Sequence, residues 1–142
     1  MSKSVRKPLY SPEILGLAVE LAQHPFDEAA TLTGTARSQS CGSTLEISLV
    51  GDPEGRIEAI GMKVAACAIG QASAAIFARH ASGAGRSAVA AMAAELASWL
   101  AGERSMPDWP DLALIAAARD YPARHGAIML PWKAAEEALS KA

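Results

Sequence analysis

Hydrophobic residues follow a helical spacing in the first part of this chain. In residues 11–23 they recur every three or four positions, behind Ser11, which can cap a helix, and Pro12, which suits the first helical turn. This pattern predicts a first helix. His24-Pro25 ends it, because proline restricts the conformation of the residue before it.

The spacing changes to a period of two between about residues 32 and 65. A polar stretch over 33–39 is a candidate edge strand, and hydrophobic and polar residues then alternate over 44–49 and again over 57–64. Segment 51–55 contains glycine, aspartate and proline, which are typical of a turn between the last two strands. The pattern predicts a small antiparallel meander.

Helical spacing returns after residue 67. A predicted helix over 68–79 is rich in small residues, and a glycine-containing break separates it from a helix that Ser87 can cap and Gly102 ends. A short helix through 112–118 follows. The core side of the middle helix is predicted from its apolar stripe, Val89, Met92, Leu96 and Leu100.

The last predicted helix has one hydrophobic side and one charged side. The charged side carries Lys133, Glu137 and Lys141 four positions apart, a pattern typical of a solvated face. Its hydrophobic side is made of Trp132, Ala135, Ala138 and Leu139. Together the elements predict an α+β fold, in which helices cover one side of a small antiparallel three-stranded sheet, with an N-terminal helix and a helical C-terminal half.

Composition limits the classes of protein that this sequence can encode. With 142 residues, 51% of them hydrophobic and 20% charged, it is expected to form a single domain over residues 1–142, with 1–8 flexible. A formal net charge of -2 and a pI near 5.9 give no general attraction to nucleic acid. No apolar run is long enough to span a bilayer or to act as a secretory signal, so no membrane association and a cytoplasmic location are expected.

The candidate residues for chemistry are two cysteines, too few for a disulfide framework. Cys41 precedes Gly42 in a tight turn at the entrance of a strand, and Cys67 lies where a strand ends and a helix begins. A thiolate at a helix N-terminus is stabilised by the helix dipole and by free N–H groups, so these thiols are predicted to take part in metal or sulfur chemistry. Burial statistics leave a second interpretation open, in which both cysteines only pack.

Three segments of the sequence resemble one family. They are Cys41-Gly42 entering a strand, residues 66–74 with Cys67 entering a small-residue helix, and residues 121–133, which end in Leu-Pro-Trp-Lys. In this order they resemble the U-type iron-sulfur cluster scaffold family, with IscU, SufU and the N-terminal domain of NifU, and the last segment is most similar to the SufU branch. The resemblance covers roughly residues 8 to 140 and implies the same α+β fold.

The resemblance also implies a ligand set, which this chain carries only in part. Family members hold a nascent [2Fe-2S] cluster or a zinc ion through three cysteines and an aspartate or a histidine. The first two cysteines correspond to Cys41 and Cys67, but the aspartate position is Ser43 and the third cysteine position is Ala127. The family's histidine would align with Gly126, one position after His125.

One chain is therefore not expected to complete the usual site, because serine and alanine do not replace an aspartate and a thiolate. Cys41, Cys67 and His125 are the candidate ligands for iron, zinc or a cluster, and His125 is also consistent with an ordinary residue at a helix start. Two chains could bridge one cluster with four cysteines, which would make a homodimer. Arg124 and Lys133 are charged neighbours that could favour thiolates or contact a partner.

The leading hypothesis is a scaffold or sulfur acceptor of iron-sulfur cluster assembly, with a cysteine desulfurase and recipient apo-proteins as the partners that the resemblance implies. No hydrolase, zinc-protease or thioredoxin motif is present, so enzymatic turnover is not expected. Two alternatives stay open. The chain could be a metal-free interaction module for a desulfurase or another assembly factor, or a redox switch if the Cα atoms of Cys41 and Cys67 lie within about 7 Å.

Overall fold

The structure is a computed structural model, and it describes residues 11–40 and 42–142. The predicted flexible residues 1–8 lie outside this part of the chain. The order of elements is α1 (Pro12–Glu20), η1 (Leu21–Gln23), β1 (Leu32–Arg37), β2 (Thr44–Gly51), β3 (Ile57–Ala65), α2 (Ala68–His80), α3 (Arg86–Leu100), η2 (Leu112–Asp120), η3 (Pro122–Arg124) and α4 (His125–Leu139), where η marks a 3₁₀ helix.

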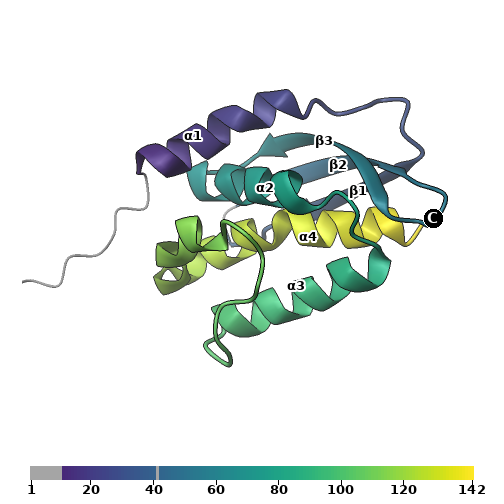
Figure 1. The fold of residues 1–142 in the computed structure, drawn as a ribbon. Coiled ribbons are helices and arrows are strands. Elements are labelled where there is room, and N and C mark those ends of the chain that lie inside the picture. The colour runs from purple at the N-terminus through teal and green to yellow at the C-terminus, as the bar shows by residue number, and fades with distance from the viewer. Residues whose placement is uncertain (1–10, 41) are drawn as a thin grey trace, which may run out of the picture.

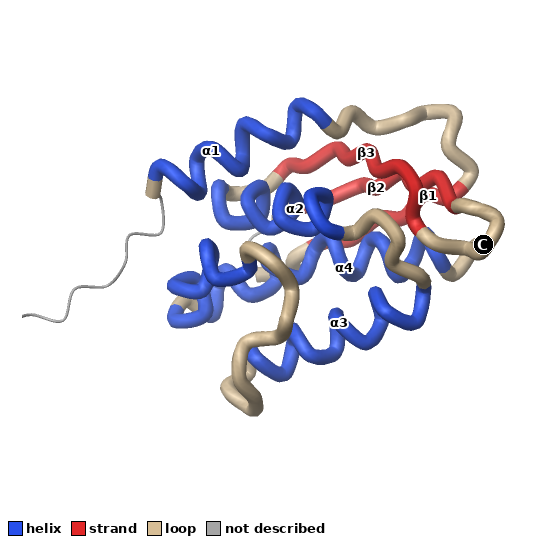
Figure 2. Tube along the Cα trace, in the orientation of Figure 1, coloured by secondary structure: helices blue, strands red, loops and turns tan. Residues whose placement is uncertain are grey.

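The three strands form one antiparallel sheet in the order β1-β2-β3. Helix α4 lies along β1 and β2, and α2 lies beside it, so helices cover one face of the sheet (Figures 1 and 2). Helix α1 packs against α2, and α3 packs against α4 as an outer layer. The predicted α+β fold is confirmed.

The alternation of side chains along β2 places one of its faces against the helices. Leu45, Ile47 and Leu49 are buried there, whereas Thr44 and Glu46 on the other face are exposed. This is the period-two burial that a half-covered sheet requires. The alternation in the sequence predicted this face correctly.

Ser48 departs from that alternation, because it is buried on the face away from the helices. The chain after α1 passes over this point, where the Asp27 N–H donates to Ser48 Oγ at 2.9 Å. The same segment also pairs with the free edge of β3, since the Met62 N–H donates to the His24 carbonyl at 2.9 Å. This segment therefore closes the β3 edge of the sheet.

The helix starts agree with the sequence at α1 and differ at α3. Ser11 caps α1, and its Oγ accepts a hydrogen bond from the Ile14 N–H at 3.3 Å. The prediction that Ser87 caps the next helix is wrong, since Gly85 is the capping residue and Ser87 lies inside the first turn. The reason lies in the segment before α3. Ile57 exchanges two backbone hydrogen bonds with residues 83–84, and because these bonds fix the chain there, the helix starts directly afterwards.

The buried side of α3 is confirmed, with Val89, Met92, Leu96 and Leu100 all in the core. The Phe77 ring stacks on Trp109 at a centroid distance of 5.6 Å, and Trp132 meets both rings edge-on. Aromatic rings in these arrangements combine large buried areas with favourable ring electrostatics. This aromatic cluster holds α2, the chain before η2, and α4 together.

Lys133, Glu137 and Lys141 are exposed as predicted, but α4 ends at Leu139, so Lys141 follows the helix instead of lying on it. Two of these three side chains also contact the sheet. Glu137 Oε1 accepts a hydrogen bond from the Thr35 N–H at 3.0 Å, and Lys141 Nζ donates to the Thr33 carbonyl at 2.7 Å. Both backbone groups lie on the edge of β1 that faces away from β2. These two side chains thus occupy hydrogen-bonding positions that a fourth strand would use.

Candidate functional site

Cys67 lies between the last strand and α2, as the sequence predicted. Strand β3 ends at Ala65, Cys67 is the N-cap residue of α2 with extended backbone angles, and the helix begins at Ala68. The thiol makes no capping hydrogen bond, the side chain is half-buried, and no acidic residue lies in the first turn. Cys67 therefore lies at the positive end of the helix dipole, and the residue as a whole has intermediate exposure.

The turn that contains Cys41 joins β1 to β2. Cys41 itself lies outside the described residues, so its role and its separation from Cys67 stay predictions. The flanking chain closes on itself, because the Ser38 N–H donates to the Ser43 carbonyl and the Gly42 N–H donates to the Ser38 carbonyl, both at 2.8 Å. Gly42 has a positive φ of 70°, which glycine adopts without steric cost. The flanking residues form the predicted tight turn.

His125 is the first residue of α4, and one of its ring nitrogens is already bonded. Nε2 lies 2.6 Å from the Arg119 carbonyl, and since a carbonyl only accepts, Nε2 carries the hydrogen. The Arg119 guanidinium in turn donates from Nε to the Trp99 carbonyl at 2.8 Å. The ring thus fastens η2 to the start of α4, and only Nδ1 is left for a metal.

The start of α4 contacts both of the other segments that the sequence singled out. At the β1–β2 turn, Ser40 Oγ donates to the Ala123 carbonyl at 3.1 Å, and a Cβ added to Gly126 would overlap Ser38 Oγ. At the start of α2, a Cβ added to Gly70 would lie 3.3 Å from that of Ala127. The three segments therefore meet, although Ser40 and Ala123 are 83 positions apart in the sequence.

Two positions where the family's ligands are expected are buried in this chain. Ser43 is 5% exposed and Ala127 is fully buried. Within residues 11–40 and 42–142, no group of three histidine, cysteine, aspartate or glutamate side chains is arranged to hold a metal ion. For this part of the chain, the structure supplies one half-buried cysteine but no complete metal site.

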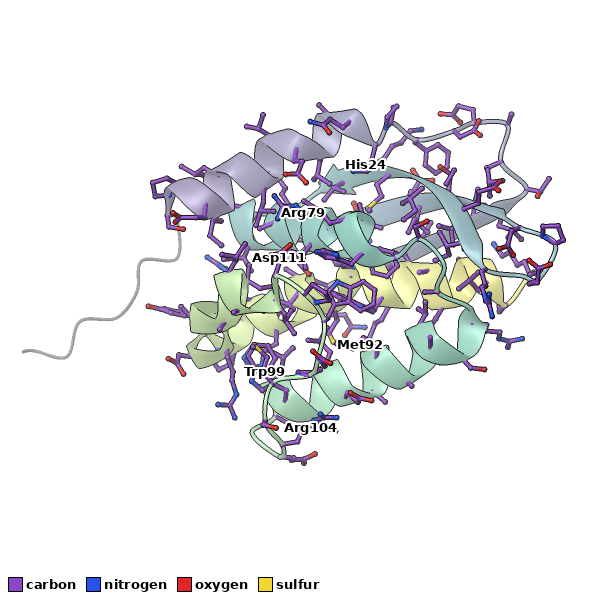
Figure 3. All side chains as sticks on the ribbon, viewed as in Figure 1. His24, Arg79, Met92, Trp99, Arg104 and Asp111 are labelled. Carbon is purple, nitrogen blue, oxygen red and sulfur yellow. The ribbon has the colours of Figure 1, made fainter. Side chains whose placement is uncertain are left out.

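A cluster of charged residues lies at the other end of α2 (Figure 3). Arg79 donates from Nε and Nη2 to the Glu20 carboxylate, each at 2.7 Å, and from Nη1 to Asp111 Oδ2 at 3.0 Å. His80 Nε2 lies 2.7 Å from the same Asp111 oxygen. The hydrogen bond from Arg79 lowers the pKa of Glu20, and those from His80 and Arg79 lower the pKa of Asp111. The sequence did not single out any residue of this cluster, because its bonded partners are 31 to 59 positions apart.

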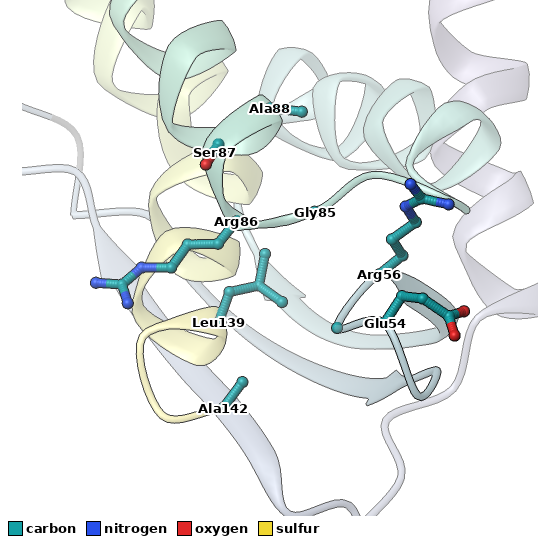
Figure 4. A pocket seen from close by; sticks show the side chains of 9 residues that line it. Glu54, Arg56, Gly85, Arg86, Ser87, Ala88, Leu139 and Ala142 are labelled. Carbon is teal, nitrogen blue, oxygen red and sulfur yellow. The ribbon is translucent and has the colours of Figure 1, made fainter.

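An open hollow of about 480 Å³ lies at the far end of α4, between the β2–β3 turn and the start of α3 (Figure 4). Arg56 and Arg86 border it, but Figure 4 shows their guanidinium groups pointing away from one another. It is lined by neither cysteine nor histidine. This hollow is separate from the site at Cys67.

Comparison with family models and with curated proteins finds no match for this sequence. Solved structures do match. A nitrogen-fixing NifU-like protein (N-terminal) from Brucella abortus has a TM-score of 0.83 and 27% identity, with 94% of this chain and 93% of that one covered. A protein of Fervidobacterium islandicum AW-1, assigned as an iron-sulfur cluster assembly scaffold for the SUF system, has a TM-score of 0.81 and 23% identity over 92% and 96%.

A further match, a hypothetical protein, has a TM-score of 0.66 and 18% identity, with 89% of this chain and 96% of that one covered. The resemblance to the U-type iron-sulfur cluster scaffold family is thereby confirmed: the chain has the fold of that family along almost its whole length. In the part of the chain that the structure describes, no helix has the length and apolar character needed to cross a membrane.

Proposed function

We propose that this protein acts in iron-sulfur cluster assembly, as a scaffold or sulfur acceptor that uses Cys67 and Cys41 and passes its cargo to recipient apo-proteins. The observation that carries the proposal is the position of Cys67, half-exposed at the N-terminus of α2 and beside the start of α4. The scaffold fold of the structural neighbours supports the same role. In this role the protein is not an enzyme that turns over a small substrate.

Sulfur acceptance needs one accessible thiolate and a donor persulfide, R–S–SH, such as the one that a cysteine desulfurase carries. The Cys67 thiolate attacks the outer sulfur of the donor, the donor's S–S bond breaks, and R–S⁻ leaves. The proton of the persulfide stays on the transferred sulfur, so the products are Cys67–S–SH and the donor thiolate. Atoms and electrons balance without an added oxidant.

Binding a cluster requires more protein ligands than accepting sulfur does, because each iron of a [2Fe-2S] cluster takes two protein donors besides its two sulfides. Cys41, Cys67 and the free nitrogen of His125 are one donor short in a single chain. Two chains supply four thiolates. A cluster cargo is therefore expected to be held between two copies of the protein, and its binding to depend on protein concentration.

The test is anaerobic sulfur transfer from a cysteine desulfurase, followed by reconstitution with iron and sulfide. Mass spectrometry should find one added sulfur on wild-type protein, less on Cys41→Ser and Cys67→Ser, and none on the double variant. If a cluster forms, sulfide-to-iron charge-transfer bands should appear together with a dimer in size-exclusion chromatography. The proposal would be ruled out if the wild type and the double variant gained the same amount of sulfur and neither showed sulfide-to-iron charge-transfer bands.

A second candidate is a metal-free interaction module that binds a desulfurase without receiving sulfur. It is favoured by the lack of a three-residue ligand group in the described part of the chain. Calorimetric titration with a desulfurase separates the two functions. The module predicts equal affinity for wild type and for the double cysteine variant, with no sulfur transferred to either.

A further inference from the structure

We infer that the site at Cys67 works without a resident metal ion, so that sulfur reaches a metal-free thiol. This inference deepens the proposed function, and its sulfur-transfer arm rests on it. It differs from what the family resemblance implies, which is a zinc ion or cluster held by four side chains. Three features of the surrounding structure carry it.

The first feature is that the replaced ligand positions have become packing positions. Ala127 is fully buried, and a Cβ on Gly70 would lie only 3.3 Å from its Cβ, so its methyl group faces Gly70 in the first turn of α2 with little room between them. Ser43 is 5% exposed, and its carbonyl accepts a hydrogen bond that closes the β1–β2 turn. Neither position presents a metal-binding atom comparable to a thiolate or carboxylate.

The second feature is the closed contact between Gly126 and the β1–β2 turn. Gly126 is where the family's histidine would align, and a Cβ there would overlap Ser38 Oγ. The same turn is fastened to the chain before α4 by the hydrogen bond from Ser40 to the Ala123 carbonyl. Since the turn fills the space beside Gly126, a ligand at this position would have to displace it.

The third feature is the bond that holds His125. Its Nε2 is 2.6 Å from the Arg119 carbonyl, and Arg119 is itself bonded to the Trp99 carbonyl and stacked over the Trp99 ring, with its guanidinium carbon 5.9 Å from the ring centroid. Swinging the ring toward a metal would break a hydrogen bond in a half-buried place and leave a carbonyl without it. His125 therefore acts as a brace between η2 and α4.

Among the described residues of the site, these features leave only the Cys67 thiol and Nδ1 of the braced His125 ring as metal-binding atoms, which is fewer than a zinc site needs. Zn²⁺ in structural sites takes four protein ligands, and catalytic zinc takes three. A thiol that is not bound to a metal is free to attack a persulfide directly, and no metal has to be displaced before sulfur arrives. The expected resting state of the protein is a reduced, metal-free thiol.

The first experiment measures metal binding by the native protein. Metal analysis after growth with added zinc, and titration with Co²⁺ followed by thiolate-to-cobalt absorption, should give fewer than about 0.1 equivalents, because too few donors are present for a zinc site. His125→Gln serves as the matched control, and its metal content should not differ from wild type. One equivalent of zinc that is lost in Cys67→Ser or His125→Gln would overturn the inference.

The second experiment measures sulfur transfer from glutathione persulfide, with EDTA in one arm and Zn²⁺ in the other. Equal sulfur uptake by Cys67 in both arms supports the inference, and uptake that requires zinc overturns it. Uptake in neither arm would instead contradict the proposed function. In that case the Co²⁺ titration still decides whether the site is metal-free, so the two failures are distinguishable.

Discussion

The two ends of α2 are held in opposite ways. At the Cys67 end the helix contacts its neighbours through small residues, with Gly70 against Ala127 and the buried Ser73 Oγ donating to the Ile128 carbonyl at 2.7 Å. At the far end the helix is fastened by Arg79 and His80, through charged hydrogen bonds to α1 and to the residue before η2.

The two ends of α2 therefore differ in role: the charged end anchors the helix, and the other end carries the candidate reactive cysteine. Charge-assisted bonds at the far end fix the position of α2 relative to α1 and η2 without placing a carboxylate near the thiol. The Cys67 end is instead packed through alanine and glycine, and no acidic residue lies in the first turn of the helix. We also expect the apolar end of α2 to contribute more to the free energy of unfolding than the charged end.

The largest expected effect comes from Gly70→Val. A Cβ at this position would lie 2.7 Å from that of Ala66, just before α2, and 3.3 Å from that of Ala127 in α4, so a branched side chain would have to displace both neighbours. Overpacking of this kind should lower the free energy of unfolding by about 3 kcal/mol. Urea denaturation followed by circular dichroism measures it.

Gly16→Ala is the matched control for that substitution, since Gly16 also lies in a helix but has nothing within 4 Å of an added Cβ. Alanine should stabilise α1 by up to about 1 kcal/mol, because it favours the helix more than glycine does. If Gly70→Val were as harmless as Gly16→Ala, the close packing at the Cys67 end would be disproved.

Ser73→Ala should have the next largest effect. Ser73 is fully buried, and its hydroxyl bonds α2 to the Ile128 carbonyl of α4. Removing a buried hydrogen bond should cost about 1–2 kcal/mol. The cost should be the same at low and at high salt, because no net charge is involved, and denaturation at both salt concentrations would reveal any difference.

Arg79→Met should have a smaller effect, about 1 kcal/mol or less, because the side chains of this cluster are 22–34% exposed and solvent screens them. The methionine keeps much of the apolar stem and removes only the charged bonds. In contrast to Ser73→Ala, its cost should shrink in about 1 M salt. A cost that salt leaves unchanged would mean that packing, not charge, holds this end.

The smallest expected effect is a loss of folding stability as the pH falls into the acid range. Because the pKa values of Glu20 and Asp111 are lowered in the folded state, their contribution is complete above the ordinary values of 4.5 and 3.8 and is lost as pH falls through the lower folded values. Arg79 keeps its charge throughout. The stability difference between wild type and Arg79→Met should therefore narrow below about pH 4, as acid titrations of both proteins can check.

Local sequence patterns predicted most of the fold. The period-two alternation located β2, and the serine and proline before α1 marked its start, because these signals depend on neighbouring residues alone. Ser87 failed as a helix cap since the start of α3 is set by backbone bonds to Ile57, thirty residues away. Ser48 is buried for a similar reason, namely a segment that crosses it from elsewhere in the chain.

The sequence predicted which segments form the candidate site, but not the hydrogen bonds that its side chains make. Glycine, cysteine and proline signals identified the three segments, and the structure brings them together. Nothing in the sequence indicates that His125 binds the Arg119 carbonyl, because any backbone carbonyl can accept and the choice depends on how η2 folds. The Arg79 cluster likewise joins residues 31 to 59 positions apart.

The hydrogen bonds from Glu137 and Lys141 to β1 have a consequence for how other proteins can approach. On the β1 side of the sheet, these two side chains bind backbone groups that would otherwise be open to a partner strand. On the β3 side, the chain that follows α1 pairs with the sheet. A visiting polypeptide would find little room to extend the sheet from either flank. A partner protein is therefore expected to contact surface side chains of the described residues rather than to add a strand to the sheet.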